Sequence, residues 1–365
     1  MKDLKPLFSD DFSFKRPFVI AGPCSVESVE QVSETGRLLS DMGILFFRAG
    51  IWKPRTKPGS FEGIGSVGLK WLTDLVASTG QTPMIEIATP YHAREALQAG
   101  IHNFWIGART AANPFAVQDL ADFFASLSEK EKDGITILMK NPVNPDIELW
   151  IGSLQRIYES GIRRLGAIHR GFSSYDSSPF RNSPEWRVPI ELKYRMPELP
   201  LFCDPSHIAG KADLVPEIAR QALELKFDGL FIEVHNCPQK ALSDAAQQLT
   251  PAHLKELMDS FVSKNDSSGA EGLVVLREKI DSLDARLLQT LAERMEISRE
   301  IGEFKKQNNM PVLQPARYDD LMKKRSHIGE SLGLNPKFVK NILSAIHEES
   351  VRQQVEINDS RGRNQ

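Results

Sequence analysis

The chain has 365 residues, of which 41% are hydrophobic and 25% charged, a composition that is typical of folded globular proteins and excludes a disordered chain. Its 45 Lys and Arg residues balance 48 Asp and Glu residues, so the overall charge gives no sign of binding to nucleic acid or to a membrane surface. The absence of an apolar run of about 18 residues and the charged N-terminus argue against a membrane span and a signal peptide. Three cysteines are too few for a disulfide framework and indicate a cytoplasmic protein.

Short runs rich in β-branched and aromatic residues recur over the first 260 residues, and most are followed by an amphipathic stretch. The predicted strands are 18–24, 44–50, 83–89, 103–109, 136–141, 163–171, 201–207 and 230–236. Their number and their alternation with helices predict an α/β fold, a (β/α)8 TIM barrel. A doubly wound open sheet is the alternative, but it normally has fewer strands and a GxGxxG motif in the turn after the first strand, and this motif is absent there. The Pro-rich connection 173–200 predicts a long loop.

Polar side chains gather at or just past the carboxyl ends of these predicted strands. They are Cys24, Arg48, Glu86, Arg109, Lys140, His169, Arg170, Asp204, His207, Glu233 and His235. In a TIM barrel the loops at this edge converge on one mouth, where catalysis takes place. The alternative interpretation is that these polar residues are simply exposed to solvent at the strand ends. However, the amino ends of the strands show no enrichment in polar residues. The sequence therefore predicts an active site at the mouth of the barrel.

Two chemical sets stand out among the side chains of the predicted mouth. The cations Arg48, Lys53, Arg109, Lys140 and Arg170 would repel one another without anionic ligands, which predicts a phosphorylated and carboxylated substrate. A second set, Cys24, His207, Glu233 and Asp244, offers sulfur, nitrogen and oxygen donors. This mixture suits a catalytic divalent ion such as Mn²⁺, Fe²⁺, Co²⁺ or Zn²⁺ better than a closed structural zinc site. Each residue alone is more often structural, so the prediction depends on their shared placement.

The composition changes after a predicted helix at 250–262. The small polar residues of 263–271 predict a flexible linker, and from residue 272 onward no strand pattern is present. Three helices are predicted instead, at 273–309, 316–333 and 336–357. The first has a long apolar stripe that needs a partner, and we expect a second copy of the chain to provide it. The predicted domains are thus a barrel at 1–262, a linker at 263–271 and a dimerising all-α domain at 272–365.

Seven motifs of the predicted barrel resemble those of 3-deoxy-D-arabino-heptulosonate 7-phosphate (DAHP) synthase. They are AGPCS (21–25), FFRAGIWKPRT (46–56), WIGART (105–110), LMKNP (138–142), DPSH (204–207), FIEVHN (231–236) and LSDAAQQL (242–249). The resemblance extends from residue 17 to about residue 262 and is best with the compact type I beta enzymes. It implies a metal-dependent condensation of phosphoenolpyruvate with erythrose 4-phosphate, without an organic cofactor.

The resemblance also implies a role for each matching residue. One divalent ion would be held by Cys24, His207, Glu233 and Asp244. Phosphoenolpyruvate would be bound by Arg48, Lys53, Arg109, Lys140 and Arg170. The erythrose phosphate would be bound by Arg55 and Thr56. Lys140 and a metal-bound water are the candidates for proton transfer. His169, next to Arg170, would help to position the residues that contact the substrate. A related synthase that makes 3-deoxy-D-manno-octulosonate 8-phosphate is the alternative, but that family usually has Lys-Ala-Asn-Arg-Ser where this chain has Lys-Pro-Arg-Thr (53–56).

Two pairs of polar residues share helix faces in the C-terminal part. Arg294 and Lys305 are eleven residues apart, almost three turns, and could bind a small dianion between them. Ser350 and Gln354 are four residues apart and also share a face. Arg277 lies on a different face from Arg294, so it would reach the same pocket only from a partner subunit. Solvated helix charges are the alternative interpretation for any one of these residues.

Residues 276–354 resemble the all-helical chorismate mutase, through LREKIDSLDARLLQTLAER, EIGEFK, ARYDDL and EESVRQQ. The resemblance implies rearrangement of chorismate to prephenate, which needs only well-placed charges. The matching binding residues are Arg277 of the partner subunit, Arg294, Lys305, Arg317, Ser350 and Gln354. Lys305 and Gln354 would meet the ether oxygen of the substrate, while the arginines and Ser350 would hold its carboxylates.

This chain departs from the mutase pattern at two positions. Tyr318 stands where the family often has Glu, and Gln314 stands at a nearby Asp position. Both can still hydrogen-bond the substrate hydroxyl, so we expect activity with weaker binding. The alternative is a non-catalytic module that senses prephenate and dimerises. Because the first predicted strand begins by residue 18, we expect no separate sensor domain, and we expect prephenate bound near Arg294, Lys305 and Arg317 to inhibit the barrel.

Overall fold

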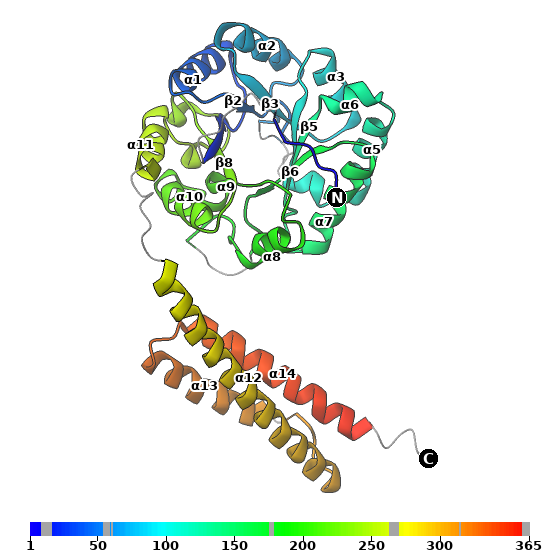
Figure 1. Ribbon diagram of the computed structural model, residues 1–365, viewed down its shortest axis with the longest axis vertical. Coiled ribbons are helices and arrows are strands. Elements are labelled where there is room, and N and C mark those ends of the chain that lie inside the picture. Colours follow the sequence, from blue (N-terminus) through cyan, green and yellow to red (C-terminus); the bar gives the residue numbers. More distant parts are fainter. Residues whose placement is uncertain are drawn as a thin grey trace. The chain divides into compact units, whose positions relative to one another are not determined.

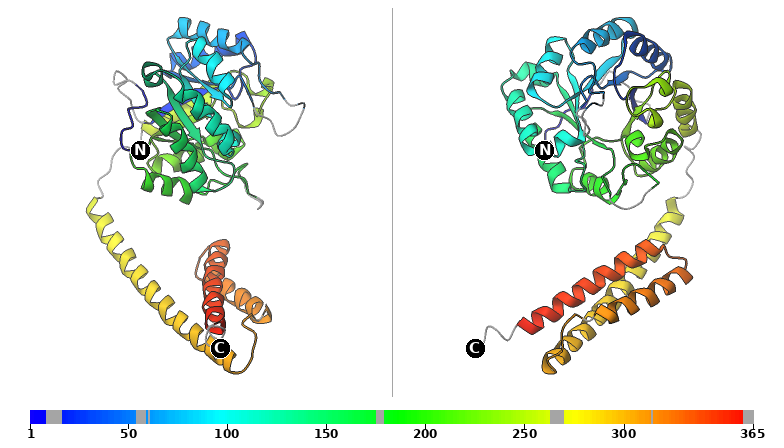
Figure 2. Two further views of the ribbon diagram at one scale, coloured as in Figure 1. Left: turned by 90° about the vertical axis from the view of Figure 1, so that its right-hand side faces the viewer. Right: turned by 180° about the vertical axis from the view of Figure 1, so that it is seen from behind.

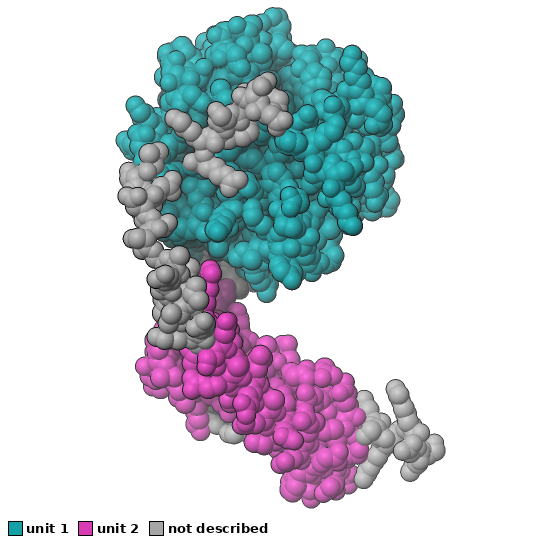
Figure 3. Space-filling model, viewed as in Figure 1, with its two compact units in different colours: residues 1–265 teal, residues 266–365 magenta. Residues whose placement is uncertain are grey.

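The computed structural model describes residues 1–8, 17–53, 59, 61–174, 179–262, 270–313 and 315–359. Side chains of 262, 270–276, 278–279, 315–320 and 359 are outside this description. The chain divides into two compact units, residues 1–265 and 266–365, which Figure 3 colours separately. The first unit carries the strands and the second is helical, as Figure 1 shows.

Eight parallel strands close into a barrel in the first unit, which confirms the predicted TIM barrel. They are β1 (Phe18–Gly22), β2 (Phe46–Ala49), β3 (Thr82–Ile87), β4 (Asn103–Ile106), β5 (Thr136–Lys140), β6 (Arg164–His169), β7 (Leu201–Cys203) and β8 (Gly229–Glu233). Neighbours in the chain are neighbours in the barrel, and β1 closes it by pairing with β8. All carboxyl ends therefore lie on the same edge, where the βα loops meet.

Helices surround the barrel. The longer ones are α1 (Val29–Asp41), α2 (Val67–Thr79), α3 (Pro90–Gln98), α5 (Pro114–Ala125), α7 (Ile147–Glu159), α8 (Arg187–Arg195), α10 (Val215–Glu224) and α11 (Pro251–Val262). The short ones are α4 (Ala108–Ala111), α6 (Glu129–Asp133) and α9 (Pro205–Ala209). Several begin at side-chain caps: Ser28 accepts from the N–H of Gln31, and Asp204 accepts from that of His207.

The connection between β6 and β7 differs from the expected long loop, because it contains the helix α8. Its buried residues Val188, Pro189 and Leu192 lie on one side of the helix and face the core. Pro189 is in the first turn, where its missing N–H would have no intrahelical partner in any case. The connection is rich in proline, which predicts a loop, but the position of Pro189 is compatible with a helix.

Alternate residues of the strands fill two separate cores. The barrel interior is packed with large side chains, namely Ile20, Phe46, Met84, Trp105, Leu138, Ile168, Phe202 and Phe231. Leu7 and Phe8 from the N-terminal segment join this interior, with the ring of Phe8 4.0 Å from that of Phe46. Strand residues of opposite orientation, such as Phe47 and Ile85, pack against the helices. The interior is thus solid, and polar side chains concentrate at the carboxyl edge.

The second unit consists of three helices in its described part, as Figure 2 shows: α12 (Ala270–Gln307), α13 (Pro315–Ser331) and α14 (Pro336–Asp359). They confirm the predicted helical region, and α14 packs against both α12 and α13. Large apolar residues of α12 are 45–67% exposed, namely Ile280, Leu283, Leu287, Leu288, Ile297, Ile301 and Phe304. Among the described residues, no helix is both long and apolar enough to cross a membrane.

Candidate active sites

A polar pocket opens at the carboxyl edge of the barrel. It is lined by Lys53, Glu86, Gly107, Ala108, Arg109, Lys140, Arg170, Arg181, His207 and Asp244. Four of the five cations that were predicted from strand ends line this pocket, and the fifth, Arg48, is buried beside it. The predicted phosphate-binding residues Arg55 and Thr56 lie outside the described residues.

Two buried carboxylates neutralise the innermost cations. Arg48 Nη2 lies 3.0 Å from Glu233 Oε1, and its guanidinium stacks 4.3 Å from the ring of Phe231. Lys140 Nζ lies 2.7 Å from Asp204 Oδ2. Burial lowers the pKa of Lys140 despite this partner, so the ammonium gives up its proton more easily than an exposed lysine does. Asp204 keeps a pKa well below its usual range, because His207, Lys140 and Arg48 outweigh the effect of burial.

The remaining cations are less buried than Arg48 and Lys140. Lys53 Nζ donates to the carbonyl oxygen of Cys24 at 2.8 Å and lies 3.1 Å from its sulfur. Arg170 donates from Nη1 to Asn182 Oδ1 at 2.7 Å, and burial lowers its pKa to about 10. Arg109 is in the short helix α4, which begins at the end of β4. Hydrogen bonds to fixed partners thus hold the side chains of Lys53 and Arg170 in place.

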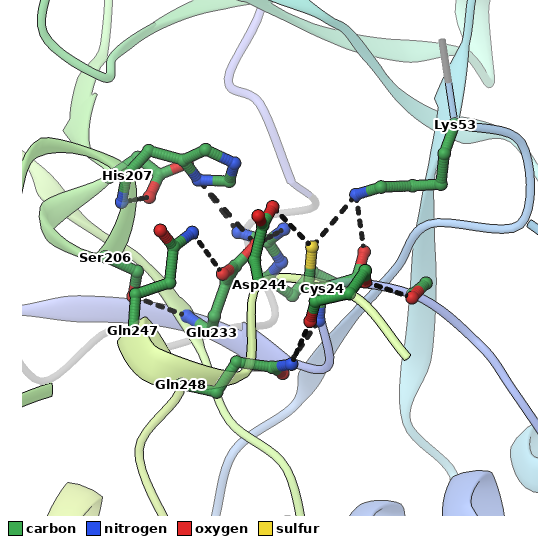
Figure 4. A network of polar contacts seen from close by, with 12 residues as sticks. Cys24, Lys53, Ser206, His207, Glu233, Asp244, Gln247 and Gln248 are labelled. Carbon is green, nitrogen blue, oxygen red and sulfur yellow. Dashed lines mark hydrogen bonds and ion pairs between the residues drawn. The ribbon is translucent and has the colours of Figure 1, made fainter. Parts of the chain in front are cut away.

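The four predicted metal ligands come from separate elements and meet in pairs (Figure 4). Cys24 Sγ lies 3.3 Å from Asp244 Oδ2, and His207 Nδ1 lies 3.7 Å from Glu233 Oε1. Burial and the charge of Glu233 raise the pKa of the Cys24 thiol to about 12. The pKa of Asp244 is far below its usual range, because His207 and nearby cations outweigh burial. The Cys24 thiol therefore loses its proton only when a metal ion binds its sulfur.

The described residues contain no group of three or more His, Cys, Asp or Glu side chains already arranged to hold a metal ion. Each predicted donor is instead held by a neighbouring polar group. Lys53 contacts Cys24, Asp204 contacts His207, Arg48 and Gln247 contact Glu233, and Arg181 contacts Asp244. One thiol, one imidazole and two carboxylates that are brought to one place still match the donors that divalent transition metals prefer. By its chemistry the set fits a divalent ion.

Sequence reasoning missed several polar residues of this site. Gln248 Oε1 accepts from the backbone N–H of Cys24 at 3.0 Å, and Gln247 Nε2 donates to Glu233 Oε2 at 2.7 Å. Both glutamines are buried, and both belong to the LSDAAQQL motif. Two adjacent amide side chains in this short segment are the sequence feature that could have indicated their role. Arg181 comes from the connection before α8, for which the sequence predicts a long loop.

A second pocket of about 580 Å³ lies among the three helices of the second unit. Arg294 donates from Nη1 to Ser350 Oγ at 2.6 Å, and Lys305 Nζ lies 3.1 Å from Gln354 Oε1. These four predicted residues therefore line the same cavity. Burial lowers the pKa of both Arg294 and Lys305, and Arg325, which sequence reasoning missed, adds a further cation to the lining.

The other residues implied by the mutase resemblance are placed differently. Arg277 is exposed, and it is not among the residues that line this cavity. Gln314 and the side chains of Arg317 and Tyr318 lie outside the described part of the chain. The cavity within one chain thus offers a site for a small anion that combines three cations with a hydroxyl and an amide.

Comparisons with known proteins support the same division of the chain. Residues 14–268 match the family model described as DAHP synthetase I, and residues 276–355 match chorismate mutase type II. Phospho-2-dehydro-3-deoxyheptonate aldolase from Thermotoga maritima is 34% identical over 254 residues, which cover 69% of this chain and 71% of that protein. A crystal structure of this DAHP synthase superposes with a TM-score of 0.58 at 30% identity, over 66% of this chain and 67% of that one.

The helical part is similar to segments of other enzymes. The bifunctional chorismate mutase/prephenate dehydratase of Escherichia coli is 37% identical over 79 residues. These residues cover 22% of this chain and 20% of that protein, so the likeness concerns one domain. Both family matches lie where the sequence motifs predicted them. The chain belongs to the DAHP synthetase I family, and it carries a chorismate mutase type II domain after its barrel.

Proposed function

We propose that the barrel condenses phosphoenolpyruvate with erythrose 4-phosphate in a reaction that needs one divalent metal ion, Mn²⁺, Fe²⁺, Co²⁺ or Zn²⁺, and no organic cofactor. The observation that carries the metal assignment is the convergence of Cys24, His207, Glu233 and Asp244 from the segments at the carboxyl ends of β1, β7 and β8, with 3.3 Å and 3.7 Å between the paired atoms. When bound, such an ion supplies Lewis-acid polarisation of the aldehyde oxygen. The free thiols fit a protein of the cytoplasm.

The cations at the mouth would bind and orient phosphoenolpyruvate. Arg109 and Arg170 line the open pocket and suit the phosphate, because a guanidinium can form two parallel hydrogen bonds to it. Arg48 lies deeper, beside Glu233, and Lys53 lines the pocket beside Cys24; both suit the carboxylate. The buried ion pair of Arg48 keeps its position fixed before substrate arrives. The erythrose phosphate would be bound by Arg55 and Thr56, a proposal that depends on the sequence motif alone.

Lys140 is our candidate for proton transfer. Carbon C3 of phosphoenolpyruvate attacks the aldehyde carbon, and the aldehyde oxygen takes up a proton as the new C–C bond forms. Water then adds at C2, and the proton that it releases returns to Lys140. The C2–O bond to the phosphate breaks, and phosphate leaves with that electron pair and with the proton of the C2 hydroxyl, so that C2 becomes a ketone. Lys140 is buried beside Asp204, with a lowered pKa that favours release of its proton to that oxygen.

For the helical domain we propose rearrangement of chorismate to prephenate in the cavity of the second unit. Arg294 and Ser350 would hold carboxylates, while Lys305 and Gln354 would donate to the ether oxygen as its negative charge develops. Arg317 and Tyr318 would complete the site, with Arg277 reaching it from the partner subunit of a homodimer. The exposed apolar residues of α12 support such a dimer.

Two assays on the full chain test these proposals. The barrel should release inorganic phosphate from phosphoenolpyruvate only when erythrose 4-phosphate is present, and a five-carbon aldose phosphate serves as the control substrate. The helical domain should convert chorismate, which is followed by the loss of its ultraviolet absorbance. If chorismate is not consumed although prephenate still binds, the helical domain is a sensing and dimerisation module instead.

A further inference from the structure

A short segment before α8, residues 179–183, connects three loops of the barrel mouth. Ser183 and Phe172 exchange two backbone hydrogen bonds of 2.8 Å, which fasten the segment to the chain that follows β6. On its other side, Asn182 N–H donates to the carbonyl oxygen of Ile208 at 3.2 Å, within the helix α9 that carries His207. The segment is therefore attached both to the loop of Arg170 and to the helix of His207.

The side chain of Asn182 makes the same connection with greater specificity. Its Oδ1 accepts from Arg170 Nη1 at 2.7 Å, and its Nδ2 donates to the carbonyl oxygen of His207 at 2.6 Å. Asn182 is buried, so neither bond is easily replaced by water. An amide is the side chain that accepts from a cation at one end and donates to a carbonyl at the other.

Two glycines allow this close approach. A Cβ on Gly171 would lie 2.9 Å from Asn182 Cβ, and a Cβ on Gly210 would lie 2.4 Å from Arg181 Cβ. Both glycines also have φ values above +70°, which favour glycine for conformational reasons. The backbone on both sides thus makes room for the pair Arg181 and Asn182.

Arg181 extends the connection to the remaining predicted ligands. Its Nη1 lies 3.0 Å from Asp244 Oδ1 and 2.7 Å from Gln247 Oε1. Gln247 in turn donates to Glu233 Oε2 at 2.7 Å. Two adjacent residues therefore contact, directly or through one amide, a phosphate-binding candidate and three of the four candidate metal ligands.

We propose that Asn182 is a positioning residue that couples the phosphate grip of Arg170 to the metal-binding orientation of His207, with Arg181 orienting Asp244. This inference depends on the proposed metal site and goes beyond it, because Asn182 touches neither the substrate nor the metal. Groups that orient metal ligands typically change metal affinity by 10- to 100-fold when they are removed. Because one amide holds both groups, its loss should weaken the binding of metal and of phosphoenolpyruvate together.

The test compares Asn182→Ala and Asn182→Asp in the full chain with the wild type. The Kd for Mn²⁺ is measured from the electron paramagnetic resonance signal of the free ion, and the Kd for phosphoenolpyruvate by calorimetry. Asn182→Ala should weaken Mn²⁺ binding about 10-fold and phosphoenolpyruvate binding at least several-fold. Asn182→Asp keeps the acceptor for Arg170 but places an oxygen against the carbonyl of His207. The loss of Mn²⁺ affinity in Asn182→Asp should therefore equal that in Asn182→Ala. Its loss of phosphoenolpyruvate affinity should be smaller.

Asn113→Ala is the matched control, because Asn113 caps α5 with its side chain and does not line the pocket at the mouth. It should lower the melting temperature without changing either Kd. Binding constants within twofold of the wild type in the Asn182 variants would overturn the proposal, whatever their melting temperatures. If Asn182→Ala does not fold, the nearly isosteric Asn182→Asp decides alone. A wild-type enzyme that binds no Mn²⁺ would instead refute the proposed metal site.

Discussion

Cys24 differs from the other two cysteines in what surrounds its sulfur. Its Sγ lies 3.3 Å from Asp244 Oδ2 and 3.1 Å from Lys53 Nζ, whereas Cys203 is buried in β7 and Cys237 is partly exposed beside Gln239. A buried thiol with a pKa of about 12 is a poor nucleophile but becomes a strong ligand once a metal displaces its proton. Its surroundings therefore favour metal binding over covalent catalysis.

We predict that Cys24→Ser lowers the condensation rate at least 100-fold, because a hydroxyl is a much poorer metal ligand than a thiolate. Cys237→Ser is the matched control and should keep nearly full activity. The measurement is phosphate release at saturating Mn²⁺, together with Mn²⁺ binding. An active Cys24→Ser variant with normal Mn²⁺ affinity would remove Cys24 from the metal site.

His169 predicts a pH dependence of stability. The ring is buried near Trp150, Trp186 and Phe172, and burial lowers its pKa to about 3. Between this value and the unfolded pKa of about 6.5, only the unfolded chain binds the proton, so stability falls as the pH falls. The slope is at most about 1.4 kcal/mol per pH unit for one such group.

We predict that His169→Phe removes this contribution. Between pH 7 and pH 5 the free energy of unfolding of the barrel should fall by about 2 kcal/mol more in the wild type than in the variant. All five tryptophans lie in the first unit, so their fluorescence in urea reports on the barrel alone. The same pH dependence in both proteins would show that His169 is not the titrating group.

At the scale of elements, strand and helix positions could be predicted because burial imposes a period on the sequence. The barrel strands follow each other in order, so each predicted strand end also predicted a place at the mouth. The contacts of Arg181 and Asn182 could not be predicted in this way. Each is a single hydrogen bond between residues that are 12 to 63 positions apart in the sequence. The periodicity of hydrophobic residues does not predict such bonds. The helix α8 was missed because the prolines of the connection around it, like Pro189 within it, are typical of loops.

In the helix α12 too, the sequence predicts only part of the mutase site. The placement of Arg294 and Lys305 on one face was predictable from helix geometry, and the structure brings both to one cavity. Arg277 lies 17 residues before Arg294 on the same helix, and it is exposed away from that lining. A site that needs Arg277 therefore needs a second chain.

We predict complementation between two inactive mutase variants. Arg277→Ala and Arg294→Ala should each lose most chorismate turnover, but a mixed dimer contains one site without either substitution. Mixing the two should restore activity, at most about a quarter of the wild-type value if subunits exchange at random. The measurement follows chorismate loss after verified subunit exchange. No recovery would contradict the shared site.

At the scale of the whole molecule, one chain joins a DAHP synthase to a domain that we propose makes or binds prephenate. Because Arg294, Lys305 and Arg325 line the cavity of the second unit, it suits a dicarboxylate such as prephenate. We predict that prephenate inhibits the condensation, with a coupling free energy of about 1–3 kcal/mol. The check is a prephenate titration of phosphate release in the full chain and in Arg294→Ala. Inhibition of equal strength in both would place the sensor outside this cavity.

The central claim is that the two units carry separate chemistries and that only the barrel depends on a metal. Treating the full chain with EDTA tests it most directly, with phosphate release and chorismate loss measured on the same sample. We predict that condensation is abolished and is restored by added Mn²⁺, while the chorismate rate stays within about twofold of the untreated enzyme, since that rearrangement needs only placed charges. Condensation that survives thorough chelation, or an equal loss of both activities, would contradict the account.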